Sequence, residues 1–332
     1  MWGLSRGFEV YDDATDVTAG ASHSPSLLER RGDPTVDRVL AWLNLHSDRP
    51  FFLWVHLYDP HSPYHPPEPY RSRYAGHPYD GEIAFDDVQV GRLFAGLRRL
   101  RLYDSALIVV AGDHGESLGE HDEAEHGFFI YNATLRISLI MKLPGSTPRK
   151  GVVNDPVGLL DVAPTIAEVC GISPESTQTF QGHSLFRLVD HQGRGLSPAV
   201  YAESYYSRNS FGWHELRALI TLQFKYIDAP RAELCALKDD PEELHNLAPA
   251  CSGLAAALRE TLDALAGRFV NARAAESSRR LDSETLEKLR SLGYLGYQAP
   301  LASGYSRLAR ADPKDKIGVF NQLLPCGQPL KP

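Results

Sequence analysis

The chain has 332 residues, of which 43% are hydrophobic and 23% charged, a composition typical of globular proteins and not of disordered or fibrous ones. Thirty-four basic and 42 acidic residues give a net charge of −8 without a Lys/Arg block, which argues against nucleic-acid binding driven by bulk charge. Four scattered cysteines exclude a disulfide framework as the main source of stability, although they leave room for one bridge. No apolar run reaches the length of a membrane span, and the first residues are not those of a signal peptide.

The first half of the chain alternates helical and strand-like patterns. Helices are predicted over residues 35–45, 81–100 and 157–170, and strands over 51–57, 106–111 and 135–143. The run 106–111 has no polar alternation, which is typical of a central parallel strand with both faces buried. Together these patterns predict an α/β sheet with helices on both faces.

Beyond about residue 190 the pattern changes to short strand candidates followed by one amphipathic helix. The strand candidates cover residues 200–203, 216–222, 224–227 and 232–237, and leucines at helical spacing mark a helix from Leu254 to Phe269. This predicts a small antiparallel sheet-and-helix subdomain. We place domains at residues 1–190 (a partial α/β domain), 191–275 (this subdomain) and 276–332, a charged tail with one short helix at about 283–292 and otherwise no core pattern.

The strongest chemical feature is the run from Gly112 to Glu116, directly after the 106–111 strand. Functional groups gather at the carboxyl ends of strands in open α/β sheets. Asp113 and His114 offer one oxygen and one nitrogen ligand for a divalent metal, and the glycines at 112 and 115 permit the turn that brings both to one ion. The alternative is a polar loop in which the aspartate caps a helix.

Two further loops carry histidines. His126, followed by glycine, is a better candidate for a group at the rim of a site than His121, which we expect at the surface. In the loop after 51–57, His61 stands between two prolines and suits a fixed hydrogen-bond donor, whereas His56 lies within the predicted strand and reads as a core histidine. We expect these loops to meet around a metal and an anionic substrate.

Several motifs in order resemble the sulfatase family of the alkaline phosphatase superfamily. They are Asp59-Pro60-His61-Ser62-Pro63-Tyr64, residues 79–84, residues 112–121 and His126-Gly127, with later landmarks at 161–165, 225–227 and 240–247. The resemblance implies an alkaline-phosphatase-like, mostly parallel sheet flanked by helices, with its amino-terminal part missing from this chain, and the small antiparallel subdomain beside it. Because members of the family usually work outside the cytoplasm, the resemblance suggests a periplasmic or extracellular location. It predicts no oligomeric state.

The resemblance implies a metal-dependent hydrolase of sulfate esters. Asp113 and His114 match metal ligands of the family, and His61 and His126 match groups that contact the sulfuryl or phosphoryl oxygens or the leaving group. Many sulfatases have asparagine at the position of His114 and lysine at that of His126. Because of these differences the resemblance leaves the metal open among calcium, zinc and manganese. The same residues also resemble phosphodiesterases and phosphoethanolamine transferases of the superfamily, which are the alternative enzymes.

The family's nucleophile motif, Cys/Ser/Thr-x-Pro-x-Arg, is absent from the 332 residues. The run 22–25 (Ser-His-Ser-Pro) does not complete it, and Asp12 and Asp13 read as a surface loop and not as metal ligands. Covalent catalysis needs a nucleophile. We therefore expect a carboxyl-terminal part of a sulfatase-like enzyme that is inactive as this chain. The alternative from another class is a catalytically dead anion-binding or scaffold protein.

Overall fold

The computed structural model describes residues 4–14, 30–145, 150–189, 199–273 and 310–323. Contacts divide the chain into two compact units. Among the described residues, unit 1 comprises 4–14, 30–108 and 142–145, and unit 2 comprises 109–141, 150–189, 199–273 and 310–323. The domain boundaries at residues 190 and 275 stay predictions.

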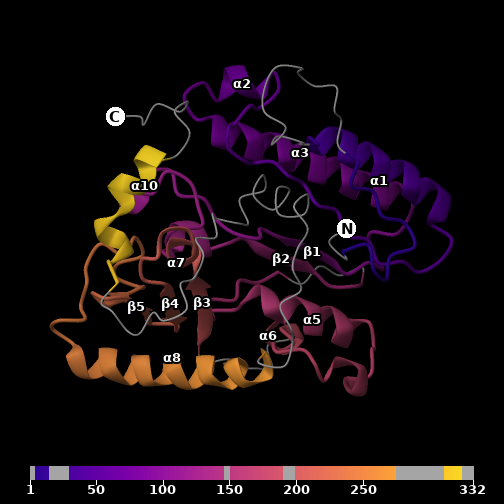
Figure 1. Cartoon of the computed structure of the whole chain (residues 1–332). Helices are drawn as coiled ribbons and strands as arrows, with labels where there is room; N and C mark the ends of the chain where they lie inside the picture. The colour runs from indigo at the N-terminus through magenta and orange to yellow at the C-terminus, as the bar shows by residue number, and fades with distance from the viewer. Residues whose placement is uncertain (1–3, 15–29, 146–149, 190–198, 274–309, 324–332) are drawn as a thin grey trace. The chain divides into compact units, whose positions relative to one another are not determined.

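Unit 1 is built on two helices that pack side by side, α1 (Gly32–His46) and α3 (Pro78–Arg99), with the short α2 (Tyr70–Arg73) between them in sequence (Figure 1). Apolar residues at helical spacing bury one stripe of each helix, including Val36 and Leu43 on α1 and Leu97 on α3. Gly96 permits the close approach, because a Cβ there would lie 2.3 Å from Cδ2 of Leu40. The helices predicted at 35–45 and 81–100 are thereby confirmed.

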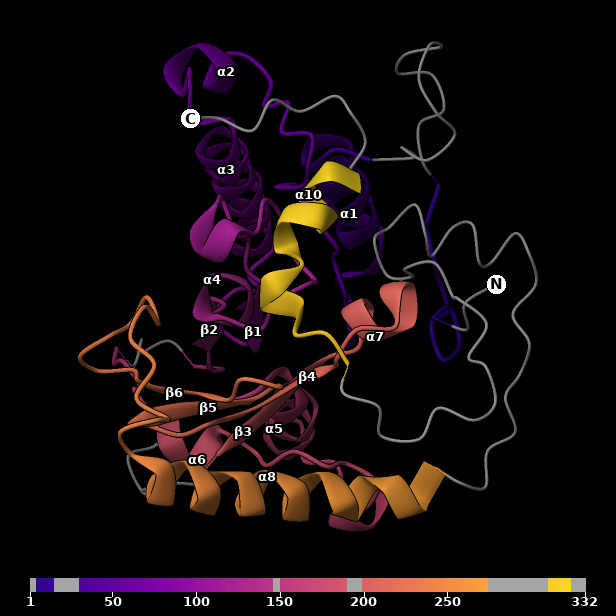
Figure 2. The same cartoon turned by 60° about the vertical axis from the view of Figure 1, so that its left-hand side comes forward.

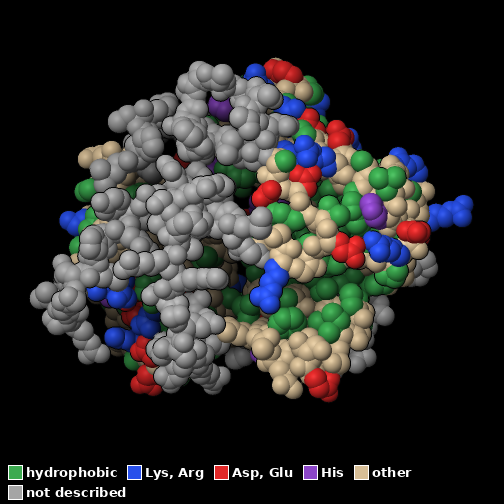
Figure 3. All heavy atoms as spheres, turned by 45° about the vertical axis from the view of Figure 1, so that its right-hand side comes forward, with side chains coloured by type: hydrophobic (Ala, Val, Ile, Leu, Met, Phe, Trp, Pro, Cys, Tyr) green, Lys and Arg blue, Asp and Glu red, His purple; other side chains and the backbone are tan. Residues whose placement is uncertain are grey.

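The buried strand predicted at 51–57 is wrong. The segment is irregular, and Phe52 and Trp54 are 62% and 58% exposed. His56 is exposed as well, so the prediction of a core histidine is also wrong. A strand requires a hydrogen-bonded neighbour, and no described strand pairs with this run. Figure 3 shows hydrophobic side chains reaching the surface among charged ones on one face of the molecule.

The strands β1 (Ile108–Ala111) and β2 (Leu139–Lys142) form a two-stranded sheet. Directly after β1, the Gly112 N–H donates to the Ser138 carbonyl at 3.1 Å. The strand predicted at 106–111 exists, but the prediction of a central strand buried on both faces is wrong. Its residues are half-buried to exposed, because β2 is the only neighbour of β1 in the described part of the chain.

Short helices follow these strands. The strand predicted at 135–143 shortens to β2, since Leu135 ends the short helix α4 (Asn132–Leu135). The helix predicted at 157–170 appears as η2 (Leu159–Asp161) followed by α5 (Val162–Val169). Other short helices of unit 2 are η1 (Glu120–Asp122), η3 (Pro174–Thr177), α6 (Phe186–Val189) and α7 (Tyr206–Phe211).

The four short strands predicted beyond residue 190 are confirmed as one antiparallel sheet in the order β3-β4-β5-β6. They are β3 (Val200–Ser204), β4 (Leu216–Ile220), β5 (Phe224–Asp228) and β6 (Glu233–Ala236). The register pairs Ala218 of β4 with Ile227 of β5. A hairpin turn at 229–232 connects β5 to β6.

Side chains alternate between the two faces of this sheet and feed two separate cores. Leu219 and Tyr226 pack on one face against the predicted long helix, α8 (Ser252–Arg273), which runs across the sheet in Figure 2. Ala218 and Ile227 pack on the other face against a cluster that includes Phe128. Both faces are therefore covered, which accounts for the nearly continuous burial of β4 and β5.

The charged tail contributes to the second of these cores, which corrects the prediction that it lacks a core pattern. Residues 310–323 form η4 (Pro313–Asp315) and α10 (Ile317–Leu323), and Ile317 and Phe320 are each 7% exposed. The helix predicted at 283–292 and the run 22–25 lie outside the described residues. Of the cysteines, those at 170, 235 and 251 are free, and position 326 is not among the described ones.

Candidate functional site

The loop after β1 presents Asp113 and His114 on adjacent positions. His114 Nδ1 lies 2.9 Å from the Gly115 carbonyl oxygen, so Nδ1 carries the proton and donates it to this oxygen. The neutral ring therefore keeps its lone pair on Nε2, the nitrogen that could bind a metal. Nε2 lies 3.8 Å from Oδ2 of Asp113, and the side chains of His114 and Asp113 are 35% and 59% exposed. One nitrogen and one oxygen donor thus lie close together on partly exposed side chains.

Gly115 fixes the path of this loop by its size. Its N–H donates to the Thr134 carbonyl at 2.7 Å, which joins the loop to α4. A Cβ on Gly115 would lie 2.2 Å from the Ala133 carbonyl oxygen, far closer than any real contact. The glycine is needed because two backbone segments approach each other here, not because the turn requires a positive φ.

His126 stacks on His114, with ring centroids 4.0 Å apart and an angle of 30° between the rings. Its Nδ1 lies 3.0 Å from Oε1 of Glu116, whose side chain is only 4% exposed. Burial by itself lowers the pKa of His126, but the hydrogen bond and charge of Glu116 and the nearby Glu125 and Glu123 outweigh it and raise the pKa. The structure therefore brings three of the four predicted site residues together in unit 2.

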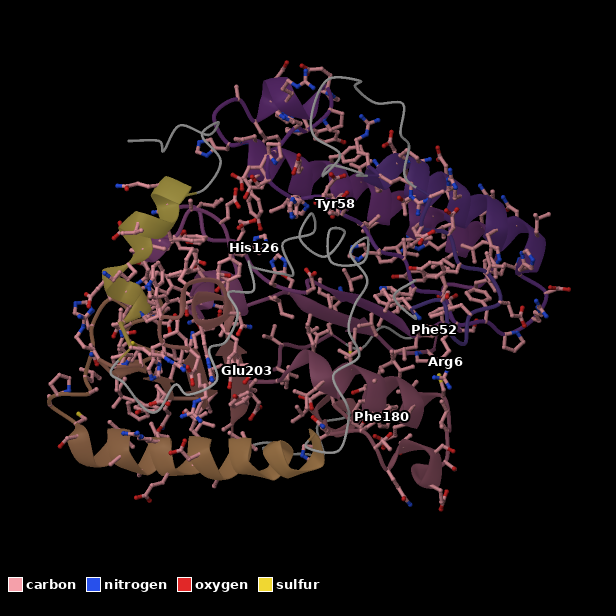
Figure 4. All side chains as sticks on the ribbon, viewed as in Figure 1. Arg6, Phe52, Tyr58, His126, Phe180 and Glu203 are labelled. Atoms are coloured by element: carbon pink, nitrogen blue, oxygen red, sulfur yellow. The ribbon has the colours of Figure 1, made fainter. Side chains whose placement is uncertain are left out.

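Buried polar groups hold the backbone beside His126, whose position on the ribbon is labelled in Figure 4. Ser204 at the end of β3 donates to the Gly127 carbonyl at 2.8 Å. Glu123, 2% exposed, accepts the N–H groups of Phe128 and Phe129 at 2.8 and 3.1 Å. Burial raises the pKa of Glu123 to about 7, against the opposing effect of these two N–H donors.

No local sequence pattern distinguishes Glu116, Glu123 or Ser204 as site residues. The two glutamates belong to a stretch rich in acidic residues, and Ser204 lies far away along the chain. The distance along the chain between Glu116 and His126 could not reveal their contact. Helices and strands bring residues together at fixed spacings, whereas loops do not. His121 points elsewhere, because its ring stacks on Tyr131 at 3.6 Å and its Nε2 lies 2.9 Å from the carbonyl oxygen of residue 242.

His61, the fourth predicted site residue, belongs to unit 1 and has its own rigid surroundings. Its Nδ1 donates to the Ser62 carbonyl at 2.7 Å. The ring stacks on Tyr58 with centroids 4.5 Å apart. The His61 N–H donates to the buried carboxylate of Glu82 at 3.1 Å, and the same carboxylate accepts the N–H of His65.

Carboxyl groups with raised pKa values also lie in unit 1. Burial and the neighbouring charges of Asp59 and Glu82 raise the pKa of Asp86 to about 8. Burial also raises the pKa of Asp59, although the Gly32 N–H donates to its Oδ2 at 3.1 Å. The Oδ1 atom of Asp86 is buried without a hydrogen-bond partner among the described residues.

The donor chemistry at Asp113 and His114 fits two ligands of a divalent metal, an acidic oxygen and an imidazole nitrogen with its tautomer set by a backbone carbonyl. No group of three or more His, Cys, Asp or Glu side chains arranged to hold a metal occurs within the described residues. Asp12 instead forms ion pairs with Arg30 and Arg38 at 2.8 and 2.7 Å. Burial opposes them, but these hydrogen bonds lower the pKa of Asp12 to about 2.

Two family models match the chain. The model Sulfatase matches residues 7–172, and the model N-sulphoglucosamine sulphohydrolase, C-terminal, matches residues 119–267. Choline-sulfatase of Rhizobium meliloti is 35% identical over 182 residues, which cover 54% of this chain and 33% of the relative. The multifunctional alkaline phosphatase superfamily protein PehA of Trinickia caryophylli is 27% identical, over 57% of this chain and 49% of the relative. The chain thus spans a third to about half the length of these relatives.

Solved structures share the fold. The putative sulfatase yidJ of Bacteroides fragilis superposes with a TM-score of 0.63 at 20% identity, over 72% of this chain and 59% of that one. The phosphonate monoester hydrolase of Agrobacterium radiobacter superposes with a TM-score of 0.61 at 19% identity, over 72% and 62% of the two chains. At this level of identity the similarity shows that the chain shares the alkaline-phosphatase-like fold of these proteins. No helix among the described residues is long and apolar enough to cross a membrane.

Proposed function

The chain belongs to the sulfatase family, and from this premise we propose that it carries part of the active site of a divalent-metal-dependent hydrolase of sulfate esters. The observation that supports the proposal is the cluster of Asp113, His114 and His126 at the end of β1. A metal ligand pair beside a histidine that can be protonated is suited to an anionic ester.

In this proposal Asp113 and His114 hold the metal. The bound ion would polarise an oxygen of the sulfuryl group and offset its negative charge. The imidazole ligand favours zinc or manganese more than calcium, which prefers oxygen ligands. The Gly115 carbonyl keeps the His114 proton on Nδ1, so that Nε2 is ready for the ion without a change of tautomer.

His126 acts in the proposal as a donor to the anionic ester. Its Nδ1 lies 3.0 Å from the buried carboxylate of Glu116, and we assign the contact with substrate to the Nε2–H of the protonated ring. The raised pKa of His126 keeps more of it protonated near neutral pH than an ordinary histidine. For His61, held within unit 1 by Ser62 and by stacking on Tyr58, the role of a contact to the substrate oxygens or the leaving group stays a prediction from the family resemblance.

Phosphate and phosphonate esters are the second candidate substrates. Phosphonate monoester hydrolases are among the structures with the same fold, and the protein PehA is described as a multifunctional member of the alkaline phosphatase superfamily. The sulfuryl and phosphoryl groups are both tetrahedral anions, so the same donors serve either one. The 332 residues contain no Cys/Ser/Thr-x-Pro-x-Arg motif, and we propose that this chain binds metal and anion without turnover.

The proposal is tested by titrating the 332-residue chain with Zn²⁺, Mn²⁺ and Ca²⁺ in a calorimeter. We expect Asp113→Asn and His114→Ala each to weaken binding by about tenfold or more, because the first removes the negative charge of an oxygen ligand and the second removes the nitrogen ligand. His77→Ala, an exposed histidine at the start of α3, is the control and should bind as the parent chain does. Equal affinities in all four proteins would refute the assignment of the metal site.

The substrate class is tested with anions. Sulfate, phosphate and methylphosphonate are added to the metal-loaded chain, and the ring resonances of His114 and His126 are followed by NMR. A shift with sulfate at lower concentration than with the other two supports the sulfate-ester proposal, and the opposite order supports the second candidate. Hydrolysis of 4-nitrophenyl sulfate by the same chain would refute the proposal of binding without turnover.

A further inference from the structure

The segment of residues 310–323 lies beyond both family-model matches, which end at residues 172 and 267. It is nevertheless anchored within unit 2 by two hydrogen bonds, one to His214 ahead of β4 and one to Arg231 in the β5–β6 turn. The Ala311 carbonyl accepts the His214 N–H at 3.0 Å, and the Asp312 side chain accepts the Arg231 N–H at 2.9 Å. Asp312 is only 5% exposed, so the second bond is shielded from water.

From this anchor, α10 reaches the loop that carries His126. The Phe320 ring stacks on the Phe128 ring with centroids 4.6 Å apart and an angle of 22°. Phe128 is fully buried, and it lies two residues after His126. The Asn321 Nδ2 group donates to the Asp122 carbonyl at 2.7 Å, four residues before His126. The helix therefore contacts the loop on both sides of the histidine.

The loop depends on such external contacts, because His126 lies on no helix or strand. The residues between η1 and α4 have no assigned secondary structure, and Gly127 has a φ of +91°. Its contacts include the bonds from Phe128 and Phe129 to Glu123, the bond from Ser204 to Gly127, and the bond from the Ser117 N–H to the Glu125 carbonyl at 3.0 Å. A segment without a helix or strand is positioned by such individual contacts, and the loss of one of them lowers the free-energy cost of local opening and displaces the side chains beside it.

We propose that Phe320 and Asn321 of α10 are positioning residues for His126, so that a segment outside the matched family regions completes the site. The inference rests on the proposed function of His126. Phe320 fixes the apolar side of the loop through Phe128, and Asn321 fixes its polar side through the Asp122 carbonyl. Neither residue needs to touch substrate.

The test compares Phe320→Ala, Phe320→Leu and Asn321→Asp with the control Val319→Ala in the 332-residue chain. Val319 lies on the same helix and is 46% exposed. The readouts are amide hydrogen exchange of residues 119–132, the ring resonance of His126 and the affinity for Zn²⁺. We expect Phe320→Ala to speed exchange of the Phe128 and Phe129 amides by about tenfold or more and to shift or broaden the His126 resonance.

Phe320→Leu, which keeps an apolar side chain, should restore most of the protection, and Asn321→Asp should affect the start of the loop while β3–β6 stay protected. Unchanged exchange and an unchanged His126 resonance in Phe320→Ala and Asn321→Asp would overturn the inference, as would an equal effect of Val319→Ala. If the loop responds as expected but the parent chain binds neither metal nor anion, the positioning role stands and the proposed function fails. If Phe320→Ala unfolds unit 2, the comparison of Asn321→Asp with Val319→Ala decides.

Discussion

The buried ion pair of Lys225 and Glu243 should couple the stability of β5 to that of the loop after β6. Lys225 Nζ lies 2.8 Å from Glu243 Oε1, and the two side chains are 0% and 1% exposed. Asn132 joins the pair, since its backbone N–H donates to Glu243 and its Oδ1 accepts from Lys225 at 3.3 Å. Burial lowers the pKa of Lys225, and the charge of Glu243 opposes this effect.

The expected magnitude follows from the distance and the burial. At this separation two unit charges attract by about 6 kcal/mol at an effective dielectric constant of about 20, and removing each ion from water costs several kcal/mol. The intact pair therefore contributes little net stability, but removal of one partner leaves the other charge buried. We expect Lys225→Met and Glu243→Gln each to lower the free energy of unfolding by about 3–5 kcal/mol. The double variant should lose at least about 2 kcal/mol less than the sum.

The assay is urea denaturation of the 332-residue chain at pH 7, followed by far-UV circular dichroism. Arg259→Gln is the matched control, because Arg259 and Asp263 form an exposed ion pair at 4.0 Å with side chains 62% and 51% exposed. Its loss should cost less than about 0.5 kcal/mol. Additive effects of the two single substitutions in the buried pair, or a loss below about 1 kcal/mol for Lys225→Met, would refute the reasoning.

Three further predictions concern the glycine turn and the buried acids. Gly115→Ala should abolish Zn²⁺ binding in calorimetry, because its Cβ would lie 2.2 Å from the Ala133 carbonyl oxygen, whereas Gly253→Ala meets nothing within 4 Å and should bind normally. The pKa of Asp86 is raised from 3.8 to about 8, so between these pH values the folded chain keeps a proton that the unfolded chain releases. The free energy of unfolding of the parent chain therefore falls as the pH rises from about 4 to 8. Asp86→Asn should therefore exceed the parent chain in stability by about 1–3 kcal/mol at pH 8 and match it at pH 4 in urea titrations. The pKa of Glu123 is raised from 4.5 to about 7, so this group also destabilises the folded chain as the pH rises between these values. The thermal-unfolding midpoint of Glu123→Gln should therefore rise relative to that of the parent chain between pH 4.5 and 7. Parallel pH profiles of variant and parent would contradict either prediction.

The candidate site could be found from the sequence to the extent that its signals are local. Asp113 and His114 follow an apolar strand directly, and their side chains are the chemical types that bind divalent metals. His126 was singled out by the glycine after it, and the structure brings it within 4.0 Å of the His114 ring. Glu116, which holds His126, could not be distinguished from the other acids nearby, because only the fold decides which of them is buried.

By itself, the sequence determined the features that depend on neighbouring residues. These are the helical periodicity of α1, α3 and α8, the four short strands of the antiparallel sheet, and the ordered motifs of the sulfatase family. The tertiary structure alone decided that the apolar run 51–57 forms no strand and that Phe320 belongs to the core. Strand pairing and burial depend on partners far away along the chain, and a run of apolar residues carries no record of which partner it meets.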